Sequence, residues 1–217
     1  MRWRIFAVLG LGRFGSSVAR ELSEIGYEVV AVDKDSERVQ DVADVVVQAV
    51  QADTTDERAL EKMGIKNVDV AIVSIGQDVQ ASILTTLQLK SMGVKKVWAK
   101  AQNELHGRVL EKVGADRVVY PERDMGVRVA HSLVSVNLLD YIEVAPDYSI
   151  AETIVPQRFA NKTLGEIDLR KNYGINVLVV KRGEGLNISP GATDMLMEGD
   201  VLIVIGPRNQ LDRLQVD

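Results

Sequence analysis

The stretch Ile5–Gly15, IFAVLGLGRFG, joins five apolar residues to a Gly-x-Gly-x-x-Gly motif. A continuous apolar run predicts a buried parallel strand, and the motif stands where such a strand turns into the first helix of a nucleotide-binding fold. Gly10 permits the tight turn, Gly12 leaves room for a phosphate, and Gly15 lets helix and strand pack closely. Backbone N–H groups at the helix start then face an anion. We therefore expect a nucleotide site here, with a bare glycine turn as the alternative.

A carboxylate further along the chain supports this interpretation. Asp33 ends the second predicted strand, about twenty residues after the glycine motif, where an acidic side chain can accept hydrogen bonds from both ribose hydroxyls of adenosine. The same charge repels a 2′-phosphate. We therefore predict an adenosine ligand rather than NADP.

More candidate binding residues follow the third and fourth predicted strands, at the edge of the sheet where ligands bind. Asp53 and Thr54 are expected to contact an adenine ring. At Ser74, Ile75 and Gly76 the backbone is expected to approach the ribose and the phosphates. Helix capping is the alternative role for Thr54 and Ser74.

Two cations lie where the charge of a polyphosphate is expected. Arg13 lies inside the glycine motif and Lys100 ends the fifth predicted strand, with a solvated surface lysine as the alternative for Lys100. Phe14 and Lys34 complete the candidate binding residues. Glu122 follows the sixth predicted strand, and its carboxylate either meets a cation bound to phosphate or caps the next helix.

Short apolar runs alternate with amphipathic stretches between Arg4 and Tyr120, which predicts repeated strand–helix units. Such repeats form an α/β fold, a Rossmann-like doubly wound parallel sheet. The predicted strands are Ile5–Leu9, Val29–Val32, Val45–Ala49, Val70–Ile75, Val97–Ala101 and Val118–Tyr120.

The pattern changes after Tyr120. Apolar residues at steps of three and four from Glu122 to Leu139 predict one long amphipathic helix, and short strands with turns beyond Pro146 predict a small α+β domain. We divide the chain into an N-terminal domain, a crossover helix and a C-terminal domain, at residues 1–123, 124–140 and 141–217. The predicted strands of the last part are Ile150–Val155, Val177–Val180, Leu186–Ile188 and Val201–Ile205.

The composition excludes several classes of function. The 217 residues include no cysteine, which rules out thiolate metal sites and cysteine nucleophiles. The net charge of −5 argues against nucleic acid as a partner, and no apolar run approaches the roughly 20 residues of a membrane span. A Tyr-x-x-x-Lys pair and a Walker loop are missing, and His106 is expected on the surface. We expect a cytoplasmic protein that is not an enzyme.

These features resemble the RCK (TrkA-type) regulators of potassium channels and transporters, most closely the KtrA-like subunits of Ktr uptake systems. The likeness spans nearly the whole chain. Its most specific strings are Val109–Asp116 and Pro121–Gly126. The other strings are Val8–Gly15, Ala31–Asp33, Leu84–Leu87 and Lys100–Asn103.

The resemblance implies a helix exchanged between subunits, a C-terminal domain of RCK_C type, and homodimers that assemble into an octameric ring. The ring would lie at the inner face of the membrane, below a potassium-translocating subunit of KtrB or TrkH type. Asp33 would hold the ribose, Lys100 the phosphates, and Arg13 the terminal phosphate of ATP across the dimer. Glu122 would join Mg²⁺ or another cation at the γ-phosphate. ATP would favour an active ring and ADP an inactive one.

The resemblance also implies a second ligand, cyclic di-AMP, at the interface between C-terminal domains. Its expected pocket residues are Asp168, Arg170, Asn176 and Pro190. For Arg170 the alternative is a surface ion pair with Asp168.

Our leading hypothesis is a nucleotide-binding regulator of potassium transport. The first rival is a TrkA-like subunit that senses NAD or NADH, because Asp33 suits any adenosine ligand. Two further classes are a small NAD-dependent oxidoreductase and a scaffold that needs no nucleotide. The identity of the bound nucleotide separates the first two.

Overall fold

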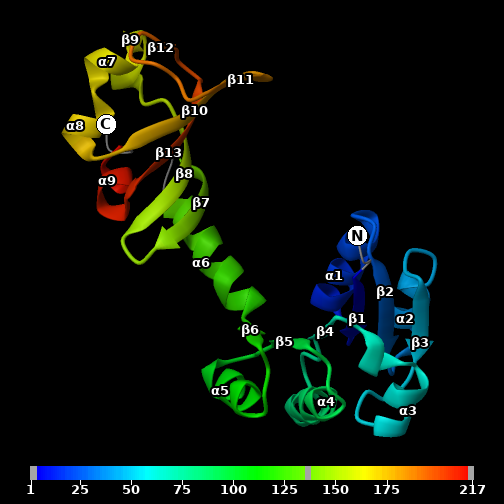
Figure 1. The fold of residues 1–217 in the computed structure, drawn as a ribbon. Coiled ribbons are helices and arrows are strands. Elements are labelled where there is room, and N and C mark those ends of the chain that lie inside the picture. Colours follow the sequence, from blue (N-terminus) through cyan, green and yellow to red (C-terminus); the bar gives the residue numbers. More distant parts are fainter. Residues whose placement is uncertain (1–3, 135–137, 215–217) are drawn as a thin grey trace. The chain divides into compact units, whose positions relative to one another are not determined.

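The computed structural model describes residues 4–134 and 138–214. The chain divides into two compact units, Met1–Pro121 and Glu122–Asp217, each with its own core (Figure 1). Among the described residues, no helix combines the length and the apolar character needed to cross a membrane.

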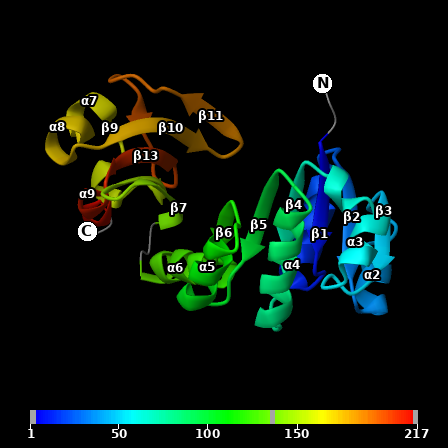
Figure 2. The same ribbon diagram turned by 60° about the horizontal axis from the view of Figure 1, so that its bottom comes forward.

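The first unit contains a parallel sheet of six strands. These are β1 (Ile5–Leu9), β2 (Glu28–Asp33), β3 (Gln48–Gln51), β4 (Val70–Val73), β5 (Lys96–Lys100) and β6 (Arg117–Val119). They lie in the order β3-β2-β1-β4-β5-β6, visible in Figure 2, and every neighbouring pair is parallel. This order is that of a doubly wound nucleotide-binding sheet, so the predicted Rossmann-like fold is confirmed.

Helices cover both faces of this sheet because successive strand residues point to opposite sides. Ala7 and Leu9 belong to a core with residues of α3, α4 and α5, whereas Val8 belongs to a second core with residues of α1 and α2. Both sides of β1 are therefore buried, as its continuous apolar run predicts. The helices are α1 (Arg13–Glu24), α2 (Ser36–Val42), α3 (Glu57–Lys62), η1 (Ile65–Asn67), α4 (Val79–Ser91) and α5 (Glu104–Lys112).

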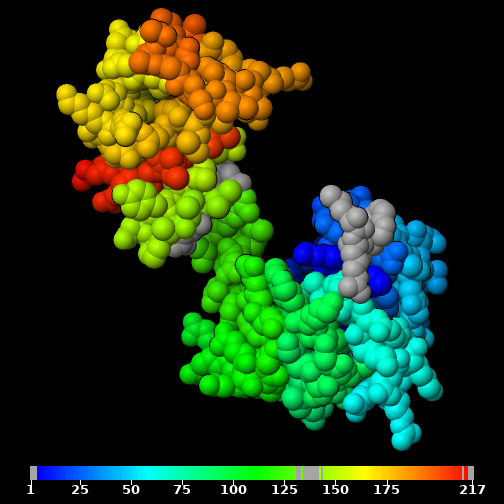
Figure 3. Space-filling view, viewed as in Figure 1, coloured from blue at the N-terminus to red at the C-terminus, as the bar shows by residue number. Residues whose placement is uncertain are grey.

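The second unit contains all of α6 (Pro121–Val134) except Pro121 and is an α+β domain, as predicted, with antiparallel sheets. Its five-stranded sheet has the order β11-β10-β13-β8-β7, beside a two-stranded sheet β12-β9. The β10–β11 hairpin projects from the unit (Figure 3). The bounds are β7 (Leu138–Ala145), β8 (Tyr148–Ile154), η2 (Gln157–Phe159), β9 (Lys162–Thr163), α7 (Leu164–Ile167), α8 (Leu169–Tyr173), β10 (Asn176–Arg182), β11 (Gly185–Ile188), β12 (Met195–Leu196), β13 (Val201–Pro207) and α9 (Arg208–Arg213).

The predicted crossover helix, residues 124–140, is too long. α6 ends at Val134, and β7 begins at Leu138 in what the sequence predicts as the last helical turn. β7 pairs antiparallel with β8, for example Ile142 with Ile150. The apolar spacing there fits a strand as well as a helix, and the β8 ladder satisfies backbone groups that a helix end would leave open.

The third strand also differs from its prediction. β3 spans Gln48–Gln51 rather than Val45–Ala49. Val45 and Val47 lie before the strand, in the turn from α2, and are 40% and 71% exposed. β3 lies at the edge of the sheet, where pairing with β2 decides its extent more than apolar character does. The two-residue strands β9 and β12 were not predicted, because two residues are too few to show a strand pattern in the sequence.

Candidate functional site

The glycine turn joins β1 to α1 at the carboxyl edge of the parallel sheet. Gly10 has a φ of +95°, a conformation that glycine adopts without strain. Its N–H donates to the carbonyl of Val32 at 2.7 Å, and its own carbonyl accepts a hydrogen bond from Ser74 Oγ. The turn is thereby tied to both strands that flank β1.

Gly12 and Gly15 differ in what a side chain would meet. A Cβ at Gly15 would overlap the carbonyl oxygen of Gly10 and Ser74 Oγ, so the close approach of α1 to the turn requires glycine. A Cβ at Gly12 would meet no atom within 4 Å, and a φ of −65° suits any residue. The protein itself therefore does not need Gly12, whereas the space beside it is what a bound phosphate needs.

The start of α1 has no side-chain cap. The helices α2–α5 begin after residues whose side chains accept hydrogen bonds from backbone N–H groups of the first turn, namely Asp35, Asp56, Asp78 and Asn103. α1 begins after Gly12, where no such bond is possible. Its first N–H groups and the positive end of its dipole are left for a solvent molecule or an anion.

Asp33 lies beside this turn and is only 5% exposed. Its Oδ2 accepts a hydrogen bond from the N–H of Leu11 at 2.6 Å, and its Oδ1 accepts one from the N–H of Asp35 at 2.9 Å. Each carboxylate oxygen retains capacity for a second hydrogen bond. Asp33 therefore shapes the glycine turn, a role that the sequence does not reveal, and can still accept from a ribose.

Arg38 is a neighbour of Asp33 that the sequence analysis missed. Its Nη1 lies 3.6 Å from Asp33 Oδ2, and its Nε lies 3.5 Å from Asp35 Oδ2. The guanidinium partly balances the charge of the buried carboxylate. The available signal was its place in the first turn of α2, directly after the strand that Asp33 ends.

Asp53 lies at the surface beyond β3. Its Oδ1 accepts hydrogen bonds from the backbone N–H and the hydroxyl of Thr55, at 2.9 and 2.7 Å. These bonds, with a smaller contribution from the nearby charge of Lys34, lower the pKa of the Asp53 carboxyl. Asp53 is therefore ionised at neutral pH, and its adenine contact remains a prediction.

Thr54 and Ser74 are both buried, and neither caps a helix. The hydroxyl of Thr54 shares a hydrogen bond of 2.9 Å with the Thr85 hydroxyl, and Ser74 Oγ holds the Gly10 carbonyl. The helices that follow are capped by aspartates instead. The capping alternative is thus wrong for both residues, whose hydroxyls support the walls of the site.

Lys100 reaches the glycine turn from the end of β5. Its Nζ lies 5.8 Å from the centre of the Phe14 ring and 3.9 Å from the place that a Cβ at Gly76 would occupy. The backbone of Ile75 lies against the turn. Arg13 is exposed as the first residue of α1. The structure thus gathers these predicted residues at one edge, with two cations close to the uncapped helix start.

Glu122 belongs to the second unit, where it is exposed in the first turn of α6. A carboxylate in the first turn interacts favourably with the helix dipole, so the position of Glu122 is the one that the capping alternative requires. Among the described residues, no three potential metal ligands cluster. A cation at Glu122 would therefore need ligands from a nucleotide or from another subunit, and it remains a prediction.

The residues predicted for a second ligand lie along α8 and β10 and after β11. Asp168, with a φ of +45°, caps α8 by accepting from the N–H of Lys171 at 3.2 Å. Arg170 is exposed and forms no ion pair with Asp168 in the described part of the chain, so the alternative of a surface ion pair is wrong. Asn176 is exposed at the start of β10, and Pro190 is partly buried.

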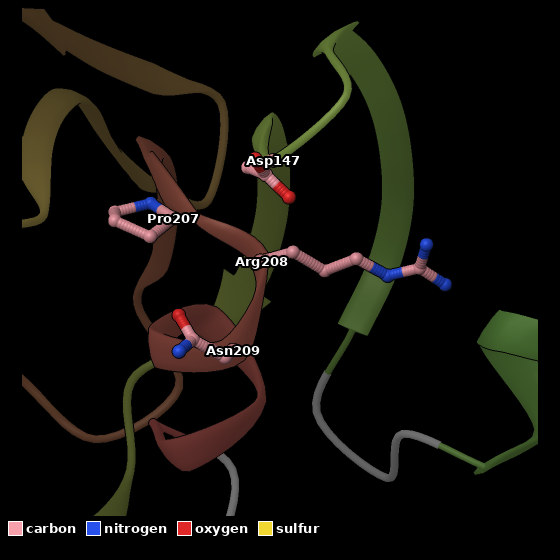
Figure 4. Close-up of a pocket in the computed structure, with 4 residues that line it drawn as sticks. All are labelled: Asp147, Pro207, Arg208 and Asn209. Carbon is pink, nitrogen blue, oxygen red and sulfur yellow. The ribbon is translucent and has the colours of Figure 1, made fainter.

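A hollow of about 360 Å³ in the second unit lies between the β7–β8 turn and the end of β13 (Figure 4). The hollow is lined by Asp147, Pro207, Arg208 and Asn209, and Figure 4 shows the Arg208 side chain extending away from those of Pro207 and Asn209. None of the residues predicted for cyclic di-AMP lines this hollow. The second ligand therefore remains a prediction.

His106 is buried, contrary to the expectation from the sequence, with 3% of its surface exposed. Its Nδ1 accepts a hydrogen bond from the N–H of Gln102 at 3.3 Å, which places the ring proton on Nε2. Nε2 has no hydrogen-bond partner among the described residues. Burial lowers the pKa of His106, because the charged imidazolium would lose its hydration.

We predict that this histidine makes the first unit less stable in mild acid. Below the ordinary histidine pKa of about 6.5, the unfolded chain takes up a proton that the folded chain resists, so stability falls as the pH falls. The slope from His106 is at most about 1.4 kcal/mol per pH unit. Urea unfolding between pH 7 and 5.5 should show a flatter dependence in His106→Gln, and parallel curves for the two proteins would contradict the prediction.

Two family models match the chain. Residues 6–121 match the TrkA-N domain and residues 150–216 match the TrkA-C domain. The chain is 48% identical over 210 residues to the Ktr system potassium uptake protein C of Bacillus subtilis, covering 97% of this chain and 95% of that protein. It is 42% identical to the Ktr system potassium uptake protein A of the same organism, with the same coverage.

Solved structures share the fold. The GsuK channel superposes with a TM-score of 0.71 and 22% identity, over all of this chain and 40% of the channel chain. The GsuK RCK domain gives a TM-score of 0.68 at 21% identity, over all of this chain and 48% of that one. At this level of identity the likeness concerns the architecture alone.

Proposed function

The chain belongs to the TrkA family of potassium transport proteins, which join a TrkA-N domain to a TrkA-C domain, and from this premise we propose that it regulates a membrane potassium transporter by binding an adenine nucleotide. The observation that carries the proposal is the uncapped start of α1 behind an open Gly12, next to the buried Asp33. Such a turn suits a phosphate and such a carboxylate suits a ribose. Relatives named as potassium uptake proteins support a role in potassium transport.

ATP and ADP are our first choice of nucleotide. Arg13 and Lys100 put two cations at the edge where the phosphates would extend, and Lys100 Nζ already lies over the Phe14 ring. A γ-phosphate would add charge-assisted hydrogen bonds that ADP lacks. A ligand shifts a conformational equilibrium only through its differential affinity for the two states, and these added bonds provide one.

NAD or NADH is the second candidate ligand. The contacts around Asp33 serve the adenosine half that all these nucleotides share. The fold itself does not choose between them, since one GsuK structure is described as bound to NAD and another as bound to ADP. The choice depends on the cations, which favour the more highly charged ATP.

A second copy of the chain is expected to cover α6. Met125, Val127 and Leu133 of this helix are 55%, 53% and 81% exposed, which is a large amount of apolar surface for one helix to leave in water. We propose that α6 packs on another subunit in a homodimer, and that dimers form a ring beneath a membrane-embedded potassium-translocating subunit. The protein would then act in the cytoplasm, at the inner face of the membrane.

The nucleotide proposal predicts a strong effect of Asp33→Asn. The change removes the negative charge that strengthens the hydrogen bonds to the ribose, and the loss of one charge-assisted bond costs about 1.5–3 kcal/mol, so the affinity for ATP should fall about 10- to 150-fold. Isothermal titration of the purified chain with ATP, ADP and NADH measures it. Asp44→Asn, an exposed aspartate before β3, is the matched control and should bind like the wild type.

The titration also tests the rival functions. Binding of NADH alone would favour the NAD(H)-sensing subunit, and nicotinamide turnover with a carbonyl or alcohol substrate would point to an oxidoreductase. If no nucleotide bound to the wild type and Asp33→Asn changed nothing, the proposed function would be wrong. Ring assembly that is indifferent to every nucleotide would favour the scaffold.

A further inference from the structure

The first unit has an exposed apolar cluster at the edge opposite the glycine turn, where β2 and β3 begin. It consists of Ile25 and Tyr27, from the turn between α1 and β2, and Val45 and Val47, from the turn between α2 and β3. Their exposed fractions are 58%, 37%, 40% and 71%. We call these four residues the amino-edge patch. Apolar side chains gathered on two neighbouring turns mark an interaction surface rather than scattered exposure.

A groove of about 410 Å³ runs through the amino-edge patch. Tyr27, Val45 and Val47 contribute its apolar wall, and Glu28 and Asp44 are the charged residues of its lining. Both carboxylates are exposed, and among residues 4–134 no lysine or arginine lines the groove. The groove therefore suits an apolar group with positive charge on either side of it. The full lining is Ser23, Gly26, Tyr27, Glu28, Asp44, Val45, Val46 and Val47.

The local fold does not account for this apolar character. Val46 is the member of the Val45–Val47 run that packs inward, with 9% exposure, and it belongs to the core beside α1 and α2. The valines on either side of it face outward in a turn that polar residues would satisfy equally well. Two outward valines beside an outward Tyr27 therefore call for a partner.

The charge of the groove decides between the possible partners. An anionic lipid surface would be repelled by Glu28 and Asp44. A second copy related by a two-fold axis would bring this acidic groove against itself, which costs electrostatic energy. The cytoplasmic loops of membrane proteins, in contrast, carry an excess of lysine and arginine. Such a loop matches both the apolar wall and the carboxylates.

We propose that the amino-edge patch is the docking surface for a lysine- and arginine-rich cytoplasmic loop of the membrane-embedded potassium-translocating subunit. An apolar side chain of the loop fills the groove, and its cations lie against Glu28 and Asp44. The proposal rests on the proposed function, which supplies the membrane partner. Because the patch and the glycine turn lie at opposite edges of one sheet, nucleotide and loop can be bound together.

The test measures binding of the full chain to inverted membrane vesicles from the organism that encodes it. Vesicles made only from the extracted lipids of those membranes serve as the comparison without membrane proteins. The wild type should sediment with the membranes and not with the lipids, and added salt should weaken binding because the contact is charged. Asp44→Lys combined with Glu28→Lys should reduce the bound fraction at least tenfold. The control is a second double variant, Glu184→Lys combined with Glu198→Lys. It makes the same change of charge at two exposed acids of the other unit and should bind normally.

A cross-link identifies the occupant. A photoreactive benzophenone residue placed at Val47 should join the chain to a peptide from a cytoplasmic loop of a multi-span membrane protein. Equal binding to lipid vesicles, a cross-link to a second copy of this chain, or a double variant that still sediments with membranes would each overturn the docking proposal. Unchanged melting and ATP titration of the double variant show that it is folded.

The outcome separates this proposal from the proposed function. If deletion of the chain lowers potassium uptake by cells and the double variant restores uptake fully, the docking surface is wrong and the function stands. If deletion leaves uptake unchanged and no nucleotide binds, the proposed function fails. The expected result is loss of uptake in the deletion strain, rescue by wild type and by the Glu184→Lys, Glu198→Lys control, and no rescue by the double variant.

Discussion

Gly12→Asp is expected to abolish nucleotide binding without harming the fold. The added Cβ has no atom of the described residues within 4 Å apart from its chain neighbours, and the backbone conformation at Gly12 suits any residue. An aspartate at this position can cap α1 as Asp35 caps α2, which adds a few tenths of a kcal/mol of stability over glycine. The same carboxylate occupies the place of the phosphate and repels it.

Thermal melting with and without ATP measures both effects. The wild type should melt at a higher temperature with ATP, by an amount that grows with ligand concentration. Gly12→Asp should melt at or slightly above the ligand-free wild type and should not respond to ATP, which corresponds to an affinity loss of more than about 100-fold. Gly76→Asp would not replace this variant as a test, because its carboxylate would lie close to the Lys100 ammonium group and could form an ion pair with it. A normal response to ATP in Gly12→Asp would contradict the site.

Gly15→Ala should have the opposite profile and destabilise the first unit severely. Its Cβ would overlap the Gly10 carbonyl, which is backbone and cannot rotate away, and Ser74 Oγ, which could rotate only by giving up its hydrogen bond to that carbonyl. α1 would have to move away from β1, and overpacking of this kind costs about 3 kcal/mol. That is a large part of the 5–15 kcal/mol that stabilises a typical protein.

The expected change in melting temperature is about 10 °C or more for a unit of this size. Differential scanning calorimetry can follow it, and Trp98 fluorescence reports on β5 of the same sheet. Gly12→Ala, the same substitution three residues earlier, is the matched control and should melt within about 5 °C of the wild type, because the space there is open and the cost is limited to alanine being a poorer helix cap. Equal melting of both alanine variants would mean that α1 does not approach the turn as closely as described.

The sequence was sufficient to predict the parallel sheet, because strands buried on both faces need continuous apolar runs. β1 occupies the predicted residues Ile5–Leu9, and the glycine motif stands directly after it. Where an apolar run is not buried the prediction was wrong, as at Val45–Val47, whose outward valines lie in a turn. Local apolar content cannot tell a strand from a docking surface.

Pairing between distant residues was the other source of error. The end of the predicted crossover helix became β7 because β8, which follows it, offers a ladder of backbone hydrogen bonds. The periodicity before Leu139 contains no information about that partner. The same holds for His106, which looks like a surface residue after the Asn103 cap and is buried by the elements packed around α5.

In the candidate site, too, the sequence predicted where residues lie but not which distant residues they contact. Position along the chain was enough to bring Asp33, Lys100 and the glycine turn to one edge of the sheet, because the carboxyl ends of parallel strands meet there. It was not enough to show what else their atoms bind. Asp33 accepts a hydrogen bond from the Leu11 N–H and lies near Arg38. The Thr54 hydroxyl shares a hydrogen bond with the Thr85 hydroxyl. Only the folded chain brings these residues together.

The most direct test of the account is the identity of the small molecule that the purified protein retains. Mass spectrometry of the ligand released by denaturation, from wild type and Gly12→Asp prepared side by side, should find ATP or ADP in the wild type and none in the variant. No nucleotide in the wild type even after incubation with ATP, or equal amounts in both proteins, would contradict the claim that the glycine turn holds the nucleotide.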